Sequence, residues 1–139
     1  MITNYSSNFF STIYFAAAVW LIYTNDSRLK QFVFVPAVVY LLAKIIPYLY
    51  NRKRPFADLA VKSLVEQRND HSFPSTHSGS SFIIALAVLN LNFFAGIIFL
   101  LAAILTALSR IMVGVHYPLD ILGAVIIAFT VHFISINFI

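Results

Sequence analysis

Arginine and histidine side chains stand at the ends of long apolar segments of this chain, where they could bind and cleave a phosphate group. Arg54 follows one such segment and Arg110 lies near the end of another, while His77 and His116 lie at the starts of two more. A charge near the hydrocarbon of a bilayer is costly unless it is paired or solvated, so these residues are functional candidates. Guanidinium groups match phosphate oxygens with a fork of donors. Two histidines can divide the roles of nucleophile and acid.

His116 and Asp120 are four residues apart at the start of the last apolar segment. If that turn is helical, they share one face, and the Asp120 carboxylate can accept the imidazole N–H. This contact would fix the tautomer and leave the other ring nitrogen free to attack phosphorus. Pro118 fits the first turn of a helix, where its missing N–H would have no partner. The spacing therefore predicts a nucleophilic histidine oriented by a carboxylate.

Ser75 and Thr76 lie where the third apolar segment begins. Their hydroxyl and backbone N–H groups would sit at a helix N-terminus, which attracts anions, and Ser75 could cap the helix as well. The chain has no cysteine and no dense set of carboxylates or histidines suited to a metal. We therefore expect no metal and no other cofactor.

The elements that position these residues are membrane helices. Of the 139 residues, 60% are hydrophobic and 10% are charged, which is far from the composition of soluble domains. A hydrocarbon core of about 30 Å needs roughly 20 apolar helical residues, and this length predicts about five spans. They cover residues 9–24 and 32–50, then a third span from residue 76 to a turn at residues 90–92, and then residues 93–113 and 117–138. The expected fold is an all-α polytopic transmembrane helical bundle in a single domain, whose short third span is tilted or buried in protein.

The polar stretch between the second and third spans, residues 51–74, is expected to form an interfacial loop, in which residues 55–67 could be a short amphipathic helix. The ends of the spans that flank the candidate residues must face one side of the membrane, which the N-terminus shares. Arg28 and Lys30 after the first span place that side outside the cell, although the basic residues of the polar stretch argue for the opposite orientation. Residues 1–8 carry no Lys or Arg, so we expect the first apolar run to be retained rather than cleaved as a signal peptide.

Three segments together resemble the signature of the type 2 phosphatidic acid phosphatase superfamily. They are Arg54-Pro55, then Pro74-Ser75-Thr76-His77, then Ser109-Arg110 with His116 and Asp120 after it. The second and third segments look most like the bacterial undecaprenyl-diphosphatase branch, the bacitracin-resistance type. The match covers roughly residues 44–123, and it implies a protein of the bacterial cytoplasmic membrane.

The resemblance implies a role for each matching residue and no metal. His116 would form a phosphohistidine, Asp120 would orient it, and His77 would protonate the leaving oxygen. The phosphoryl oxygens would be held by Arg54, Ser75, Thr76 and Arg110. The chain departs from the family pattern at two positions: the family's Lys seven residues before Arg54 is replaced by Pro47, and Thr76 stands where the family has Gly or Asp. Lys44, one helical turn deeper, could substitute, with Arg52 or Lys53 as alternatives.

The predicted function is hydrolysis of a lipid phosphate, with undecaprenyl diphosphate as the substrate that the resemblance favours. Phosphatidylglycerophosphate and phosphatidic acid are the alternatives within this chemistry. A vanadate-dependent haloperoxidase would share the anion site but is a soluble type of enzyme, and a non-catalytic protein could use the site to hold a lipid phosphate. The structural alternatives are an interfacial anchor for Arg54, helix contacts for the histidines and a helix cap for Asp120. No nucleic acid partner is expected, because the basic residues behind the formal charge of +4 are scattered.

Overall fold

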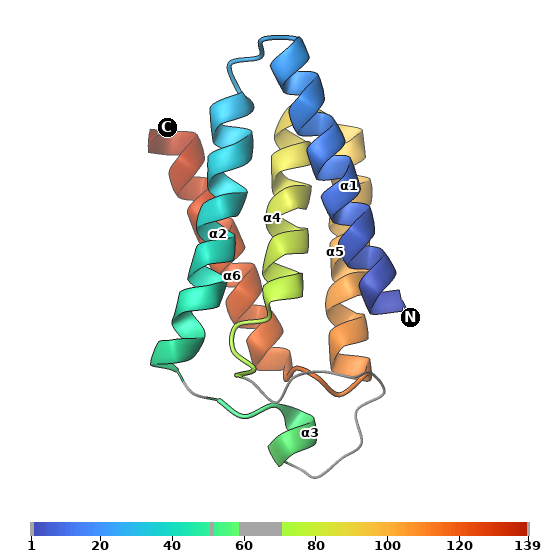
Figure 1. Cartoon of the computed structure of the whole chain (residues 1–139), viewed down its shortest axis with the longest axis vertical. Coiled ribbons are helices and arrows are strands. Elements are labelled where there is room, and N and C mark those ends of the chain that lie inside the picture. Colours follow the sequence, from blue (N-terminus) through green and yellow to red (C-terminus); the bar gives the residue numbers. More distant parts are fainter. Residues whose placement is uncertain (1, 51, 59–70, 139) are drawn as a thin grey trace.

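The computed structural model describes residues 2–50, 52–58 and 71–138, and within them the chain is helical with no strand. The helices are α1 (Ile2–Tyr23), α2 (Leu29–Leu49), α3 (Pro55–Asp58), α4 (Thr76–Leu91), α5 (Phe93–Met112) and α6 (Pro118–Phe138). The all-α prediction is therefore confirmed for the described part of the chain. Figure 1 shows the five long helices running side by side, with α3 at one end of the bundle.

The central helix of the bundle is α4, which packs against α1, α2, α5 and α6. Nearly every side chain from Ser78 to Val88 is buried, as expected for a helix that is apolar on all sides and surrounded by others. At Gly79, α4 packs against two neighbours, and a Cβ there would lie at an ordinary contact distance of 3.7 Å from both Val39 of α2 and Ala124 of α6. The short third span is thus explained by burial in protein, which is one of the two predicted solutions.

The hairpin between α4 and α5 turns at Asn92, whose side chain accepts a hydrogen bond from the N–H of Ala95 at 2.9 Å. This bond caps the start of α5. Gly96, one turn into α5, lets the two helices approach, because a Cβ at this position would lie 2.3 Å from the Cα atom of Leu89. The turn predicted at residues 90–92 is confirmed.

Three helices, namely α2, α5 and α6, are long and apolar enough to cross a membrane by length and composition. Residues 8–23 of α1 and all of α4 form shorter apolar helices. Large apolar side chains such as Phe15, Trp20 and Leu105 are more than half exposed on the outside of the bundle. Such a surface is unfavourable in water and suits contact with lipid.

The helix boundaries differ from the predicted ones mainly at the first two spans. Helix α1 already begins at Ile2 and α2 at Leu29, earlier than the hydropathy pattern suggests, and α2 contains Pro36 and Pro47. Polar residues near a helix start carry no hydrophobic signal, so the pattern underestimates both lengths. Of the amphipathic helix predicted at residues 55–67, α3 covers the first turn, and the rest lies outside the described residues.

The ends of the helices that carry the candidate residues converge, as parity requires. Figure 1 shows the end of α2 and the starts of α4 and α6 at the same end of the bundle as the end of α5 and the N-terminus of α1. At the opposite end, the guanidinium of Arg28 donates a hydrogen bond of 3.2 Å to the carbonyl of Asn90 and ties the first loop to α4. The fold therefore gathers segments that are distant in sequence around one site.

Candidate active site

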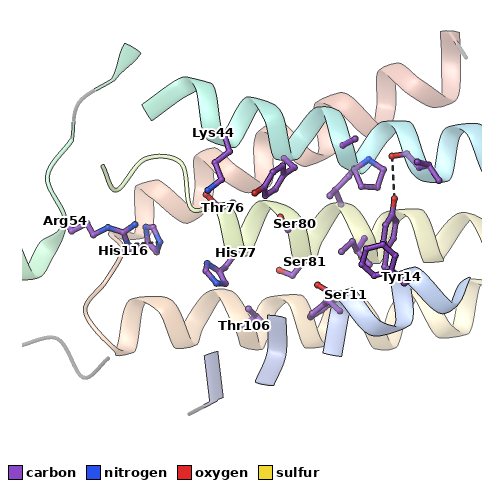
Figure 2. Close-up of a pocket in the computed structure, with 18 residues that line it drawn as sticks. Ser11, Tyr14, Lys44, Arg54, Thr76, His77, Ser80, Ser81, Thr106 and His116 are labelled. Carbon is purple, nitrogen blue, oxygen red and sulfur yellow. Dashed lines mark hydrogen bonds between the residues drawn. The ribbon is translucent and has the colours of Figure 1, made fainter. Parts of the chain in front are cut away.

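A pocket of about 610 Å³ lies inside the bundle at this converging end. Figure 2 shows it extending from the segment before α6 along α4 toward α1. The predicted site residues in its wall are Lys44, Arg54, Thr76, His77 and His116. The others, Ser75, Arg110 and Asp120, are buried and lie outside that wall.

His116 is 4% exposed and lies two residues before α6 begins. Its Nδ1 is 2.9 Å from the backbone carbonyl oxygen of Ser72, and its Nε2 is 3.4 Å from Nη1 of Arg54. A carbonyl can only accept and a guanidinium can only donate, so both contacts assign the same tautomer. The proton is on Nδ1, and the lone pair of Nε2, which accepts from Arg54 in this structure, is the one that could attack an electrophile when a ligand takes over Arg54.

Asp120 is close to His116 but does not form the predicted hydrogen bond. The distance from its Oδ2 to Nδ1 of His116 is 3.6 Å, whereas the same Oδ2 accepts from the backbone N–H of Tyr117 at 2.8 Å. The prediction assumed a helical turn at His116, but α6 starts at Pro118, and Asp120 instead reaches back to the residue before the helix as in a capping box. Its other oxygen, Oδ1, pairs with Nη1 of Arg52 at 3.2 Å.

Arg54 and Arg110 bring two guanidinium groups to the site from different segments. Arg54 is 7% exposed and donates from Nη1 to the carbonyl of Val115 at 3.3 Å. Arg110, in the last turn of α5, is 1% exposed, and within the described part of the chain neither its Nε nor its Nη2 has a hydrogen-bond acceptor. Because a buried charged donor without an acceptor is costly, this side chain is suited to binding an anion.

The first turn of α4 supplies Thr76 and His77 to the pocket wall. Ser75 occupies the position before the helix, but its hydroxyl makes no capping bond and lies 3.0 Å from the hydroxyl of Ser78. Ser75 is therefore the N-cap residue of α4, as predicted, but its side chain forms no capping hydrogen bond. Its backbone N–H donates instead to the carbonyl of Asp120 at 3.2 Å, which ties the start of α4 to α6.

The three basic residues considered as substitutes for the family's phosphate-binding lysine lie in different places. Lys44 is in the pocket wall, with its Nζ 5.6 Å from the ring centroid of Tyr40. Arg52 points to Asp120, and Lys53 is exposed and does not belong to the pocket wall. Of the three, Lys44 is placed to meet a ligand.

Burial lowers the pKa of the His116 imidazole from its ordinary value, because desolvation disfavours the charged ring. The nearby carboxylate of Asp120 opposes this effect, while the positive charges of Arg54 and Arg110 add to it. The imidazole is therefore neutral near pH 7, which is the state that a nucleophile needs.

Within residues 2–50, 52–58 and 71–138, no group of three or more His, Cys, Asp or Glu side chains could hold a metal ion. The two histidines outside the site lie apart from the pocket. His71 has its ring centroid 6.3 Å from that of Tyr48, and His132 is 8% exposed inside the bundle near the opposite end of α4.

The arrangement of two arginines, two histidines and a helix N-terminus at one end of a membrane bundle agrees with a known family. A profile of the PAP2 superfamily matches residues 28–139, which contain every predicted site residue. The chain belongs to the PAP2 superfamily. The resemblance recognised in three short segments is thus confirmed over most of the chain.

Two PAP2 relatives illustrate the similarity in sequence. Undecaprenyl-diphosphatase BcrC of Bacillus subtilis (strain 168) is 34% identical over 125 residues, which are 87% of this chain and 64% of that protein. The bacitracin transport permease protein BcrC of Bacillus licheniformis is 38% identical over 105 residues, which are 73% of this chain and 52% of that protein. The chain therefore spans between half and two thirds of the length of these relatives.

Two solved PAP2-like structures share the fold. A transmembrane PAP2 type phosphatidylglycerolphosphate phosphatase from Bacillus subtilis superposes with a TM-score of 0.78 at 25% identity, covering 99% of this chain and 72% of that one. LpxE of Aquifex aeolicus gives a TM-score of 0.83 at 22% identity, covering 98% and 84%, and this likeness concerns the fold alone. Together with the apolar helices, the family makes this chain a multi-pass membrane protein.

Two contacts in the PAP2 site were not predicted from the sequence. The first is the carbonyl of Ser72, which accepts the Nδ1 proton of His116. No side-chain pattern marks a backbone acceptor, so the sequence has no signal for it. The second is the pair between Arg52 and Asp120, since Arg52 was considered only as a substitute for a phosphate-binding lysine. Its position two residues before Arg54 was the available hint.

Proposed function

We propose that this chain is a lipid phosphatase that transfers a phosphoryl group to His116 and then to water. One observation carries the proposal: the imidazole is held by Ser72 through Nδ1 and presents its Nε2 lone pair beside Arg54 in the pocket wall. Membership in the PAP2 superfamily supports the same chemistry.

In the first step, Nε2 of His116 bonds to phosphorus while the bond from phosphorus to the leaving oxygen breaks. His77, across the pocket in the first turn of α4, gives a proton to that oxygen. In the second step, His77 takes a proton from water, the water oxygen attacks phosphorus, and the bond between phosphorus and Nε2 breaks. The products are inorganic phosphate and the lipid alcohol or lipid monophosphate.

The charge on the phosphoryl oxygens in the transition state is met by Arg54 and by Arg110, whose buried guanidinium has unused donors in the described structure. Thr76 contributes from the N-terminus of α4. Ser75 lies behind Thr76 and supports it through its contacts with Ser78 and Asp120. The mechanism uses these side chains and no metal ion or other cofactor.

The substrate we propose is undecaprenyl diphosphate, which becomes undecaprenyl phosphate. The Bacillus subtilis relative that carries this activity in its name supports the choice. The pocket also continues from the charged end toward Tyr14 of α1 (Figure 2), and its wall includes the apolar side chains of Phe15 and Val33, which suit a hydrocarbon chain. Lys44 in the same wall would neutralise the second phosphate. Phosphatidylglycerophosphate is the alternative, supported by the similar Bacillus subtilis structure, and phosphatidic acid is a further one.

The proposed location is the bacterial cytoplasmic membrane, crossed by the five long helices, with the site on the outer side. Arg28 and Lys30 lie at the opposite end of the bundle, which places that end in the cytoplasm by the usual excess of basic residues there.

The deciding experiment measures phosphate release in detergent with EDTA present, from undecaprenyl diphosphate, phosphatidylglycerophosphate and phosphatidic acid in parallel. His116→Ala is compared with His71→Ala, a matched histidine outside the pocket wall. We expect the parent chain and His71→Ala to release phosphate and His116→Ala to lose the activity. Release that persists in His116→Ala would refute the histidine mechanism. Binding of the lipids without release by the parent chain would instead identify a non-catalytic lipid-phosphate-binding protein.

A further inference from the structure

Arg52 touches both groups that orient His116. Its side chain reaches Asp120, with 3.2 Å between Nη1 and Oδ1. Its backbone carbonyl accepts a hydrogen bond of 2.8 Å from the N–H of Ser72, and the carbonyl of Ser72 in turn accepts the Nδ1 proton of His116. One residue thus anchors the acceptor on one side of the imidazole and the carboxylate on the other.

The guanidinium of Arg52 is itself held in place by an aromatic ring. It lies 4.3 Å from the ring centroid of Tyr117, a distance at which a cation is attracted to the ring face. The hydroxyl of Tyr117 donates to Oδ2 of Asp58 in α3 at 2.9 Å. Stacking, ion pair and hydrogen bond connect the segment after α2 and helix α3 to the start of α6.

The ion pair between Arg52 and Asp120 also determines how strongly the negative charge of Asp120 acts on the imidazole of His116. Asp120 has no exposed side-chain surface, and besides Arg52 it is met by the N–H of Tyr117 and, at 3.6 Å, by His116. With Arg52 in place, part of the carboxylate charge is neutralised from the side away from the ring. Without it, the full charge of Asp120 would favour the protonated imidazole.

We propose that Arg52 is a positioning residue of the phosphatase site, which holds Asp120 and thereby keeps His116 neutral and correctly oriented for attack. This inference rests on the proposed function for its consequence in catalysis, but the geometry that it explains is independent of the substrate. Arg52 does not line the pocket and its guanidinium is already paired with Asp120, unlike that of Arg110, so it acts through Asp120 and Ser72 rather than on the phosphate.

The other charged or titratable groups around His116 come from every element packed against it. They are Asp120 of α6, Arg54 of the segment before α3, Arg110 of α5, His77 of α4 and, in the same pocket wall, Lys44 of α2. All but Asp120 disfavour the imidazolium when they are positively charged. Arg52 is distinguished from them because its contact is with the single carboxylate of the group.

The test is a titration of His116 by NMR in detergent, with histidine labelled and the His116 signal assigned by its loss in His116→Ala. Arg52→Gln removes the charge, Arg52→Lys keeps it, and Lys53→Gln removes the charge of the neighbouring exposed residue. The loss of Arg52 leaves the negative charge of Asp120 unpaired beside the imidazole, and a charge at such a distance shifts a neighbouring pKa by about one unit or more. We therefore expect Arg52→Gln to raise the His116 pKa by about one unit, with a shift below about 0.3 in the other two variants.

A second comparison tests whether Arg52 acts through Asp120. In an Asp120→Asn background, Arg52→Gln should move the His116 titration by less than about 0.3 unit, because the carboxylate that it exposes is gone. An equal shift in both backgrounds, or a shift in Lys53→Gln as large as in Arg52→Gln, would overturn the proposal. If Arg52→Gln does not fold, Arg52→Lys decides, since a rise of a full unit there contradicts a role based on charge.

Phosphate release as a function of pH separates this proposal from the proposed function. The acid limb of kcat/KM should move upward in Arg52→Gln by the same amount as the NMR titration and return in Arg52→Lys. A parent chain that releases no phosphate would refute the proposed function while the NMR titration still tests Arg52. An active parent chain whose acid limb and NMR titration are both unchanged in Arg52→Gln would refute the role of Arg52 alone.

Discussion

Replacing Arg110 by methionine should stabilise the protein without ligand and strongly reduce its activity. Arg110 is 1% exposed, and its Nε and Nη2 have no acceptor among the described residues. Each buried donor left without an acceptor costs about 1 to 3 kcal/mol. Methionine has a similar length and no polar hydrogen, so Arg110→Met removes this cost with little loss of packing.

The expected gain is about 1 to 3 kcal/mol, in the range measured when buried charges are replaced by apolar side chains. For a chain of this size, 1 kcal/mol corresponds to roughly 3 °C in Tm, so Tm should rise by about 3 to 9 °C. Phosphate release should fall by about 10² to 10³, the usual effect of removing one donor to transition-state charge. Thermal unfolding in detergent and phosphate release on the same preparations measure both.

Orthovanadate, a mimic of the phosphoryl group, supplies a third readout. It should raise the Tm of the parent chain, by the equivalent of about 2.7 kcal/mol at a hundred times its Kd, and should raise that of Arg110→Met much less. Arg28→Met is the control, because Arg28 is half exposed and paired with Asp26 at 2.6 Å at the other end of the bundle. It should change stability by less than about 1 kcal/mol and leave activity intact. A lower Tm in Arg110→Met together with retained activity would refute the reasoning.

Three further predictions concern the nucleophile and the packing of α5. His116→Asn should lose the acid-labile phosphoenzyme that mass spectrometry detects in the quenched parent protein, and a surviving adduct would point to another nucleophile. Because burial lowers the His116 pKa, the acid limb of kcat/KM should lie below about pH 6.5, and a limb above that pH would contradict this. The stability that neutral His116 contributes should be complete above about pH 6.5 and should decline as the pH falls below it. Gly96→Ala should lower stability by about 3 kcal/mol, since its Cβ would lie 2.3 Å from the Cα of Leu89, whereas Gly114→Ala, with open space but a φ of +74°, should cost about 1 to 2 kcal/mol; equal Tm values would be inconsistent with the packing described.

Most of the fold could be predicted because hydropathy and membrane thickness together define the length of a span. The turn at Asn92 and the central burial of α4 followed from the short third apolar run. The early starts of α1 and α2 could not be predicted, because polar residues there continue a helix through backbone bonds that leave no apolar pattern. The candidate site residues were chosen by type and spacing, and the fold places Arg54 and His116 of this set in one pocket wall.

The details of the site were harder to predict, because they depend on where a helix begins. A shift of the start of α6 to Pro118 takes His116 out of the helix and changes the partner of its Nδ1 from a carboxylate to the carbonyl of Ser72. Every residue carries a carbonyl, so the sequence contains no information on which of them accepts the proton. The same limit applies to Arg52, whose partner is chosen by the path of the segment after α2.

One of the two groups that orient the proposed nucleophile is a backbone carbonyl, and side-chain mutagenesis will not detect that group. An alanine scan would find Ser72 nearly silent, although its carbonyl accepts the proton of the attacking imidazole at 2.9 Å. Ser72 is fully buried, so packing limits the side chains that fit there, but any residue type at this position would carry the same carbonyl, and sequence comparison therefore cannot register the contact. Replacing the amide between Ser72 and Phe73 by an ester, which weakens the carbonyl as an acceptor and leaves both side chains unchanged, would expose its contribution.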